Sequence, residues 1–181
     1  MSPLILVLLL VVVAAVVFVV VRNGSAPKTV DVSANVSHAL SQAGLKDVTT
    51  SQDREKGVVT LDGHVTADND KIRAESIARS LAGQQVVANR IEVLPAGVEA
   101  DARKVNAAID KGISSNLEAA VIQYNLRDVK YAVKNHLVTL TGDVDTPEVR
   151  NKAEMVASAV PNVQQVVNEI QVRVQKATST R

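Results

Sequence analysis

The sequence of 181 residues contains no cysteine. This absence excludes a disulfide framework, a thiolate metal site, a cysteine nucleophile and a lipid-modified N-terminal cysteine. It is compatible with a location on either side of a membrane. Aromatic side chains are almost absent as well, since Phe18, Tyr124 and Tyr131 are the complete set. Any folded core must therefore be packed with Val, Ile, Leu and Ala.

An excess of charge of one sign is also missing, because the formal net charge is only +1. Strong electrostatic binders of nucleic acid usually carry a basic face and a high isoelectric point, so we predict no nucleic-acid partner. No catalytic constellation is present: the three histidines, His38, His64 and His136, lack an i+4 partner, and neither a G-x-S-x-G elbow nor a phosphate loop occurs. We predict three exposed histidines, no catalytic residue, no metal ligand and no cofactor.

A long apolar run, in contrast, is present near the N-terminus. Leu4 to Val21 has no polar side chain, and as a helix it would span about 27 Å, close to the roughly 30 Å hydrocarbon core of a bilayer. We predict a transmembrane anchor within residues 1–22, followed by a polar linker at 23–29. A cleaved signal peptide is the alternative, although its apolar region normally runs about 7–15 residues after a basic stretch.

The largest feature is an internal repeat. Val59–Val93 returns without a gap as Val138–Val172, 79 residues later, with 13 of 35 positions identical. Such similarity at one fixed offset indicates one fold present twice. We place the two units at residues 30–94 and 98–174 and a disordered tail at 175–181.

Hydrophobic periodicity predicts the elements of the first unit. Val36 and Leu40 belong to the buried stripe of a first helix. Strands are predicted at 48–53 and 58–65 around a turn at 54–57; Val59, Leu61 and Val65 face the core, and Thr60, Asp62 and His64 face away. A helix at 67–81, capped by Thr66, and a strand at 87–93 complete an αββαβ order. The fold class is α+β: a small sheet with two helices on one face.

The second unit departs from this pattern in one place. Val105, Ala108, Ile109 and Gly112 repeat the apolar stripe of the first helix. Keeping that alignment requires about 12 inserted residues near Ser114–Asn125, which we expect to extend the helix by two turns. Thr146-Pro147-Glu148 predicts the start of the second helix, with Thr146 as its cap.

Two glycines and two asparagines are among the repeated residues that are not aliphatic, and we interpret these four as a structural signature. Gly63 and Gly142 lie on the apolar face of a strand, which predicts that the alanine-rich second helix approaches there. Asn89 and Asn168 lie in an apolar row, where a buried amide must be hydrogen-bonded.

These residues together resemble the BON domain, the bacterial osmotically induced and nodulation domain. The pattern V-V-T-L-x-G-x-V, A-E-x-x-A, V-x-N-x-I-x-V occurs as Val58–Val65, Ala74–Ala78 and Val87–Val93, and again as Leu137–Val144, Ala153–Ala157 and Val166–Val172. The resemblance implies a non-enzymatic αββαβ module, often found in tandem in periplasmic or outer-membrane-associated proteins. It also implies links to envelope integrity, osmotic stress and phospholipid binding.

The resemblance further decides between two membrane orientations. Arg22 and Lys28 follow the apolar run and no basic residue precedes it, so the positive-inside rule would leave the units in the cytoplasm. We instead expect a single-pass inner-membrane protein with its units in the periplasm, because the resemblance implies that compartment and two charges are a weak signal.

Two kinds of partner follow as hypotheses. Anionic phospholipid or an envelope protein would be bound by basic side chains outside the buried stripes, and the candidates are Lys104, Lys111, Arg150 and Lys152. The alternative is a self-associating scaffold whose open sheet edges pair with other copies or with partner domains.

Overall fold

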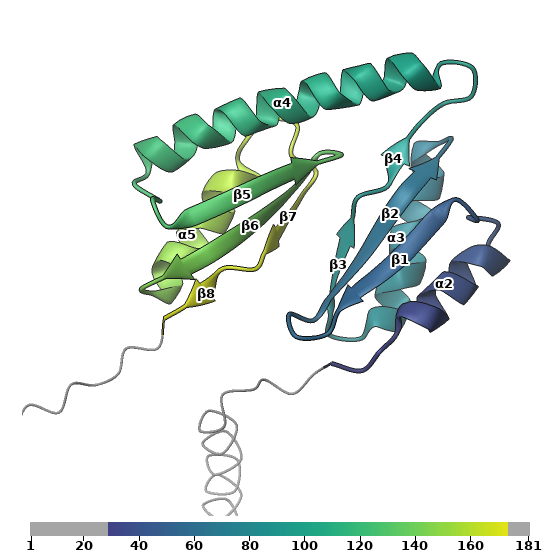
Figure 1. Ribbon diagram of the computed structural model, residues 1–181, viewed down its shortest axis with the longest axis horizontal. Coiled ribbons are helices and arrows are strands. Elements are labelled where there is room, and N and C mark those ends of the chain that lie inside the picture. Colours follow the sequence, from purple (N-terminus) through teal and green to yellow (C-terminus); the bar gives the residue numbers. More distant parts are fainter. Residues whose placement is uncertain (1–28, 174–181) are drawn as a thin grey trace, which may run out of the picture.

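The computed structural model describes residues 29–173 as two α+β units (Figure 1). The first unit consists of α2 (Ser33–Gln42), β1 (Val48–Asp53), β2 (Val58–Val65), α3 (Asp68–Ala82), β3 (Val86–Asn89) and β4 (Glu92–Val93). The second unit consists of α4 (Glu99–Gln123), β5 (Val129–Lys134), β6 (Leu137–Val144), α5 (Pro147–Ser158), β7 (Gln165–Asn168) and β8 (Gln171–Val172). The expected fold class of the units is confirmed.

The predicted membrane span, the predicted tail and the predicted linker up to residue 28 lie outside the described residues. Within residues 29–173, no helix combines the length and the apolar composition needed to cross a bilayer.

The central strand of each sheet is the second one. β2 pairs antiparallel with β1 and parallel with β3 and β4, and β6 makes the same pairs in the second unit. The bounds of the first two strands match the prediction. The predicted single last strand is instead two short strands, because the side-chain oxygen of Asn89 accepts the Ile91 N–H at 3.2 Å and interrupts the ladder. Asn168 and Ile170 repeat this interruption.

Helix starts follow the prediction in one unit only. Thr146 caps α5 and accepts a hydrogen bond from the Val149 N–H at 3.4 Å, with Pro147 in the first helical position. The predicted cap Thr66 is wrong, because α3 begins after Ala67 and has no side-chain cap. Its acidic first turn, with Asp68 and Asp70, complements the helix dipole instead.

The first helices correct the predicted alignment of the units. α4 has 25 residues and α2 has 10, and they end at equivalent positions, Gln123 and Gln42. The additional residues are therefore Glu99–Ile113 at the start of α4. Ser114–Gln123 is the true counterpart of α2, so the insertion placed near Ser114–Asn125 was wrong.

Burial gives the reason for this correction. Ile113 and Leu117 are 1% exposed and belong to the core of the second unit. They are equivalent to Val32 and Val36 of the first unit, whereas Val105 is 56% exposed. The extension carries apolar residues at helical spacing as well, and this second periodicity misled the sequence alignment. The hairpin turn is then two residues shorter in the second unit, Asn135–His136 against Arg54–Gly57.

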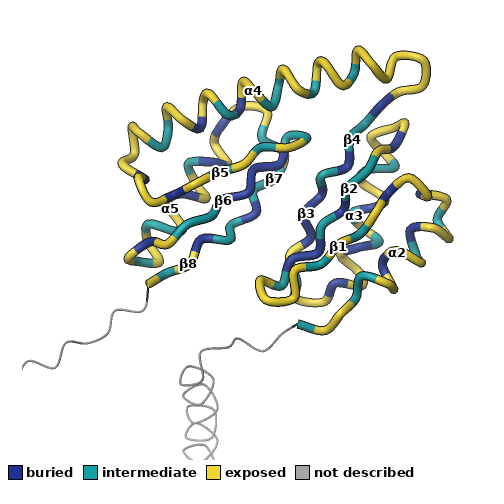
Figure 2. The backbone as a smooth tube through the Cα atoms, viewed as in Figure 1, coloured by how far each residue is buried: buried dark blue, intermediate teal, exposed yellow. Residues whose placement is uncertain are grey.

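The two sheets pack on each other through the faces opposite their helices (Figure 1, Figure 2). Val58, Ala88, Leu137 and Val167 form a small buried core there, each at most 5% exposed. Val58 is equivalent to Leu137 and Ala88 to Val167, so both units use the same patch. The interface is thus isologous, as in a two-fold dimer.

Candidate functional site

The signature glycines mark the closest backbone approach in each unit. A Cβ atom on Gly63 would lie 2.0 Å from the Asp47 carbonyl oxygen, and one on Gly142 would lie 2.1 Å from that of Asp128. Their φ angles are +107° and +126°, where side chains are strained. The predicted reason was wrong: the start of the preceding strand, and not the alanine-rich helix, requires glycine.

The signature asparagines connect the last strand to the second helix. Asn89 Nδ2 donates to the Lys71 carbonyl at 3.2 Å and to Glu75 Oε2 at 2.9 Å. Asn168 makes the same bonds to the Arg150 carbonyl and Glu154. The recurrence of Glu75 as Glu154 therefore has a structural cause, since each carboxylate holds its Asn.

Two of the four candidate surface cations are used inside the fold. Arg150 donates to the carbonyls of Ile170 at 3.1 Å and Asn168 at 3.3 Å. Lys152 Nζ donates to the Tyr124 carbonyl at 3.2 Å and lies 5.5 Å from the centre of the Tyr124 ring. Arg73 makes the equivalent bond to Ala43, so this cation stabilises the C-terminus of the first helix in both units.

The other two candidates lie on the outer side of α4. Lys104 is exposed and pairs only with exposed Asp101 at 3.1 Å. Lys111 is exposed and makes no ion pair or hydrogen bond within the described residues. Ile122, which is 74% exposed, follows Lys111 by three helical turns. At about 100° per residue these three side chains fall within roughly 20° of one line.

The extension of α4 joins the two units. Asp110 accepts the backbone N–H groups of Asn135 and His136, both at 2.8 Å. Asn106 Nδ2 donates to Glu92 of β4 at 3.3 Å. Asn135 Nδ2 completes the connection with a 2.6 Å bond to the Arg90 carbonyl. No pattern in the sequence indicated this role.

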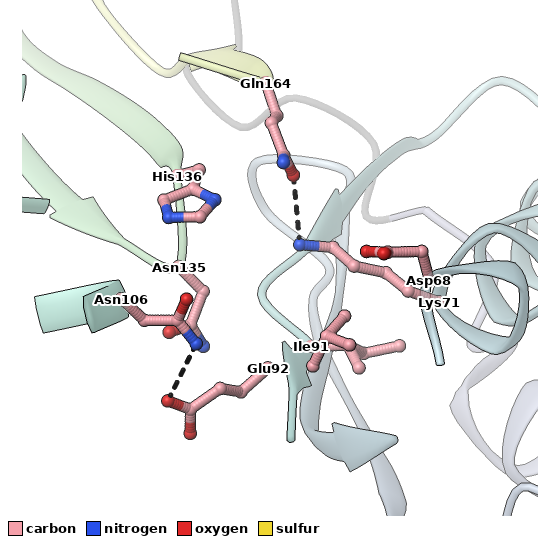
Figure 3. Close-up of a pocket in the computed structure, with 9 residues that line it drawn as sticks. Asp68, Lys71, Ile91, Glu92, Asn106, Asn135, His136 and Gln164 are labelled. Atoms are coloured by element: carbon pink, nitrogen blue, oxygen red, sulfur yellow. Dashed lines mark hydrogen bonds between the residues drawn. The ribbon is translucent and has the colours of Figure 1, made fainter. Parts of the chain in front are cut away.

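A small polar cavity of about 80 Å³ lies beside this junction (Figure 3). Lys71 and Ile91 of the first unit and Asn135, His136 and Gln164 of the second line it, and Lys71 Nζ donates to Gln164 at 3.2 Å. Burial lowers the pKa of Lys71 and of His136, whose Nε2 is buried without a partner. The expected exposed position of His136 was wrong, whereas His38 and His64 are exposed as predicted.

We expect acid to loosen the contact between the units through His136. Its pKa lies below the ordinary 6.5 because burial and Lys71 outweigh the attraction of Asp110. The packed state therefore prefers neutral His136, and its stability is full above about pH 6.5 and falls as pH decreases below it. His136→Asn, which keeps the positive φ accessible, should reduce the drop in melting temperature between about pH 7.5 and about pH 5. His64→Asn is the matched control and should leave the drop unchanged; equal drops in all three proteins would contradict the assignment.

Edge strands are protected where the units meet. The Gln165 side chain imitates a strand peptide: Nε2 donates to the Val87 carbonyl at 2.6 Å, and Oε1 accepts the Asn89 N–H at 3.0 Å. Arg150 donates to the Asn168 carbonyl at the end of β7. β1 and β5 form the opposite edges of the two sheets, and each pairs with the central strand alone.

The described residues contain no cluster of His, Asp or Glu placed to hold a metal ion. The features that could bind a partner are surfaces. They are the exposed line of Lys104, Lys111 and Ile122 on α4, the junction between the units, and a groove lined by Val86 and Arg150 among others.

Comparisons with known proteins agree with the repeat. The model of the BON domain family matches residues 28–95 and again residues 104–174. Osmotically-inducible protein Y of Escherichia coli (strain K12) is 26% identical over 146 residues, which are 78% of this chain and 71% of that protein.

Solved structures give weaker similarities. The C-terminal domain of CdsD, a structural protein of the type III secretion system of Chlamydia trachomatis, is 12% identical with a TM-score of 0.34 and covers 82% of this chain and all of that one. Another CdsD structure is 13% identical with a TM-score of 0.36, covering 80% of this chain and 93% of its own.

Proposed function

Since the chain belongs to the BON domain family and carries the domain twice, we propose that it is a non-enzymatic protein of the bacterial cell envelope that binds anionic phospholipid or a membrane protein. The name of the Escherichia coli relative suggests a role under osmotic stress. Support of envelope integrity is the corresponding physiological role.

The outer line of α4 carries this proposal. Lys104 and Lys111 are exposed to solvent, Lys104 beside its ion-pair partner Asp101, and Ile122 adds an exposed aliphatic side chain. Exposed lysines are attracted to anionic headgroups by about 1 kcal/mol each near the membrane surface, and the exposed carboxylates of Asp101 and Glu118 beside this line reduce that attraction. Arg150 and Lys152 contribute less, because their donors serve carbonyls of the fold.

We expect full-length protein to bind phosphatidylcholine vesicles that contain phosphatidylglycerol and to bind pure phosphatidylcholine much less. Reversing both charges, Lys104→Glu with Lys111→Glu, should weaken this binding on the order of tenfold or more, and added salt should weaken it too. Cosedimentation with vesicles measures both effects.

The matched control reverses two other exposed lysines, Lys46→Glu with Lys130→Glu, and keeps the net charge equal to that of the test variant. Equal binding by the two double variants would show that only net charge matters. No binding at low salt by any protein would contradict the lipid form of the proposal.

The membrane anchor at Leu4–Val21 and the periplasmic location are part of this proposal. A reporter fused at the C-terminus, active only in the periplasm, tests both together with membrane fractionation. An inactive reporter on a fusion protein that is present in the membrane fraction would reverse the proposed orientation.

Self-association through open sheet edges is the alternative function. The unpaired edges of β1 and β5 support it, whereas Gln165 and Arg150 cover the edges of β3 and β7. Sedimentation of the protein without the apolar run would separate the two functions, because a strict monomer is inconsistent with a scaffold.

A further inference from the structure

The contact between the units follows an approximate two-fold axis beyond its apolar core. Lys56, in the first hairpin turn, pairs with Glu169 at 2.7 Å. Asn135, in the second hairpin turn, donates to the carbonyl of Arg90. Arg90 and Glu169 occupy equivalent positions, so each turn reaches the same place on the other unit.

This axis relates two cavities. The small cavity of about 80 Å³ is lined by Lys71, Ile91, Glu92 and Val93 with the second hairpin turn. A groove of about 400 Å³ is lined by their four equivalents, Arg150, Ile170, Gln171 and Val172, with the first hairpin turn. The two are therefore the same site formed twice, five times larger in volume at the second position.

The extension of α4 accounts for the difference. Asn106 lines the small cavity and bonds Glu92, and Asp110 holds the hairpin turn beneath it. Among the described residues, which begin at Thr29, the first unit has no such extension, since α2 starts at Ser33. Thr29 instead pairs its backbone N–H with the Arg54 carbonyl. Within residues 29–173, no helix therefore closes the groove as α4 closes its counterpart.

The groove offers apolar contact with balanced charge. Val86, which is 47% exposed, and half-buried Val172 are the valines that the groove presents to solvent, whereas Val58 and Val167 in its lining belong to the buried core between the units. The equivalent of Val86 is Gln165, whose amide is hydrogen-bonded across the interface. At the rim, Lys56 and Arg150 are matched by Glu55 and Glu169, so the groove has no preference for a strongly charged ligand.

We propose that this groove binds an amphipathic α-helix of another protein, seated where the two-fold axis would place a second copy of the α4 extension. The apolar side of that helix covers Val86 and Val172, and its polar side meets the mixed charges of the rim. The groove is continuous with the core between the units, and the chain itself shows a helix bound at the equivalent position. This surface is distinct from the basic line of α4, so the proposal does not depend on lipid binding.

The test uses the α4 extension as its probe. A fluorescein-labelled peptide with the sequence of residues 98–113, acetylated and amidated, is titrated with the full chain in detergent and followed by anisotropy. We expect saturable binding of modest affinity, because an isolated helix of this length is marginal in water. Val86→Asp and Val86→Trp, which charge or fill the groove, should each weaken binding on the order of tenfold, and salt should change it less than about twofold.

The control is Val105→Asp, which alters a valine of similar exposure, 56%, on α4, and should leave binding unchanged. Absence of saturable binding, or equal binding by the Val86 variants, would overturn the proposal. Loss of binding in Glu92→Gln with retention in Val86→Asp would also overturn it, because the peptide would then occupy the site of α4. Vesicle binding by the Val86 variants should be normal, so failure here and failure of the lipid proposal are distinguishable.

Discussion

Replacing Gly63 or Gly142 by alanine should unfold the unit that contains it. The added Cβ would meet the carbonyl oxygen of Asp47 or Asp128 at about half of a normal contact distance, at a φ that alanine rarely adopts. Backbone on both sides of the contact must move, and the expected cost exceeds about 3 kcal/mol. Units of this size are marginally stable, so a loss of this magnitude is a large share of the total. Denaturant unfolding followed by circular dichroism measures it.

Gly112→Ala is the matched control for this prediction. Gly112 lies within α4, an added Cβ there has nothing within 4 Å, and its φ is negative. Alanine should stabilise the helix by about 0.5–1 kcal/mol, because glycine costs more backbone entropy. Equal effects of the glycine substitutions on stability would contradict the assigned close approach.

Asn89→Ala should produce the second largest loss. Asn89 is 4% exposed and makes three hydrogen bonds, to the Lys71 carbonyl, to Glu75 and from the Ile91 N–H. Its removal leaves these groups without their partner, and each unsatisfied buried group costs about 1–3 kcal/mol. We expect a total destabilisation of about 2–4 kcal/mol, measured by thermal or denaturant unfolding.

Asn168→Ala offers an internal comparison. It removes the same set of bonds, but Asn168 and Glu154 are more exposed than Asn89 and Glu75. Water can replace part of what is lost, so the cost should be smaller than for Asn89→Ala. A larger loss at Asn168 would show that burial does not govern the contribution of the repeated Asn.

The sequence predicted local structure well where a pattern had one interpretation. Alternation placed the bounds of β2, a Thr-rich segment before a turn placed those of β1, and the Thr-Pro-Glu signal placed the start of α5. It failed where two patterns competed. The apolar spacing of Val105 and Ile109 looked like the stripe of the first helix, although Ile113 and Leu117 provide that stripe. Only packing against a sheet decides which of two apolar periods is buried.

The candidate surface shows the same limit. Basic residues outside the buried stripes could be identified from helical spacing, and Lys104 and Lys111 do face solvent. Spacing gave no signal that Lys152 and Arg150 reach carbonyls on neighbouring elements, since those carbonyls are distant in the chain. The half-buried position of His136 was missed for a related reason, because His136 lines a cavity together with Lys71 and Ile91, which are distant in the chain.

The sequence by itself determined that this protein is one small fold repeated, with aliphatic cores and an Asn and a Gly at matching places. Those properties follow from local periodicity and from the similarity of the halves. The tertiary structure decided how the halves differ. The face of β2 that carries Val58 and Thr60 is half-polar in sequence, a pattern typical of a solvent-facing side. In the folded chain, Val58 instead packs against Leu137 and Val167 of the second unit in a buried interface. The contact between the units forms two equivalent cavities. The long helix α4 narrows the one beside Lys71, and the one beside Arg150 stays open. Such asymmetry depends on contacts between residues far apart in sequence, which no local pattern records.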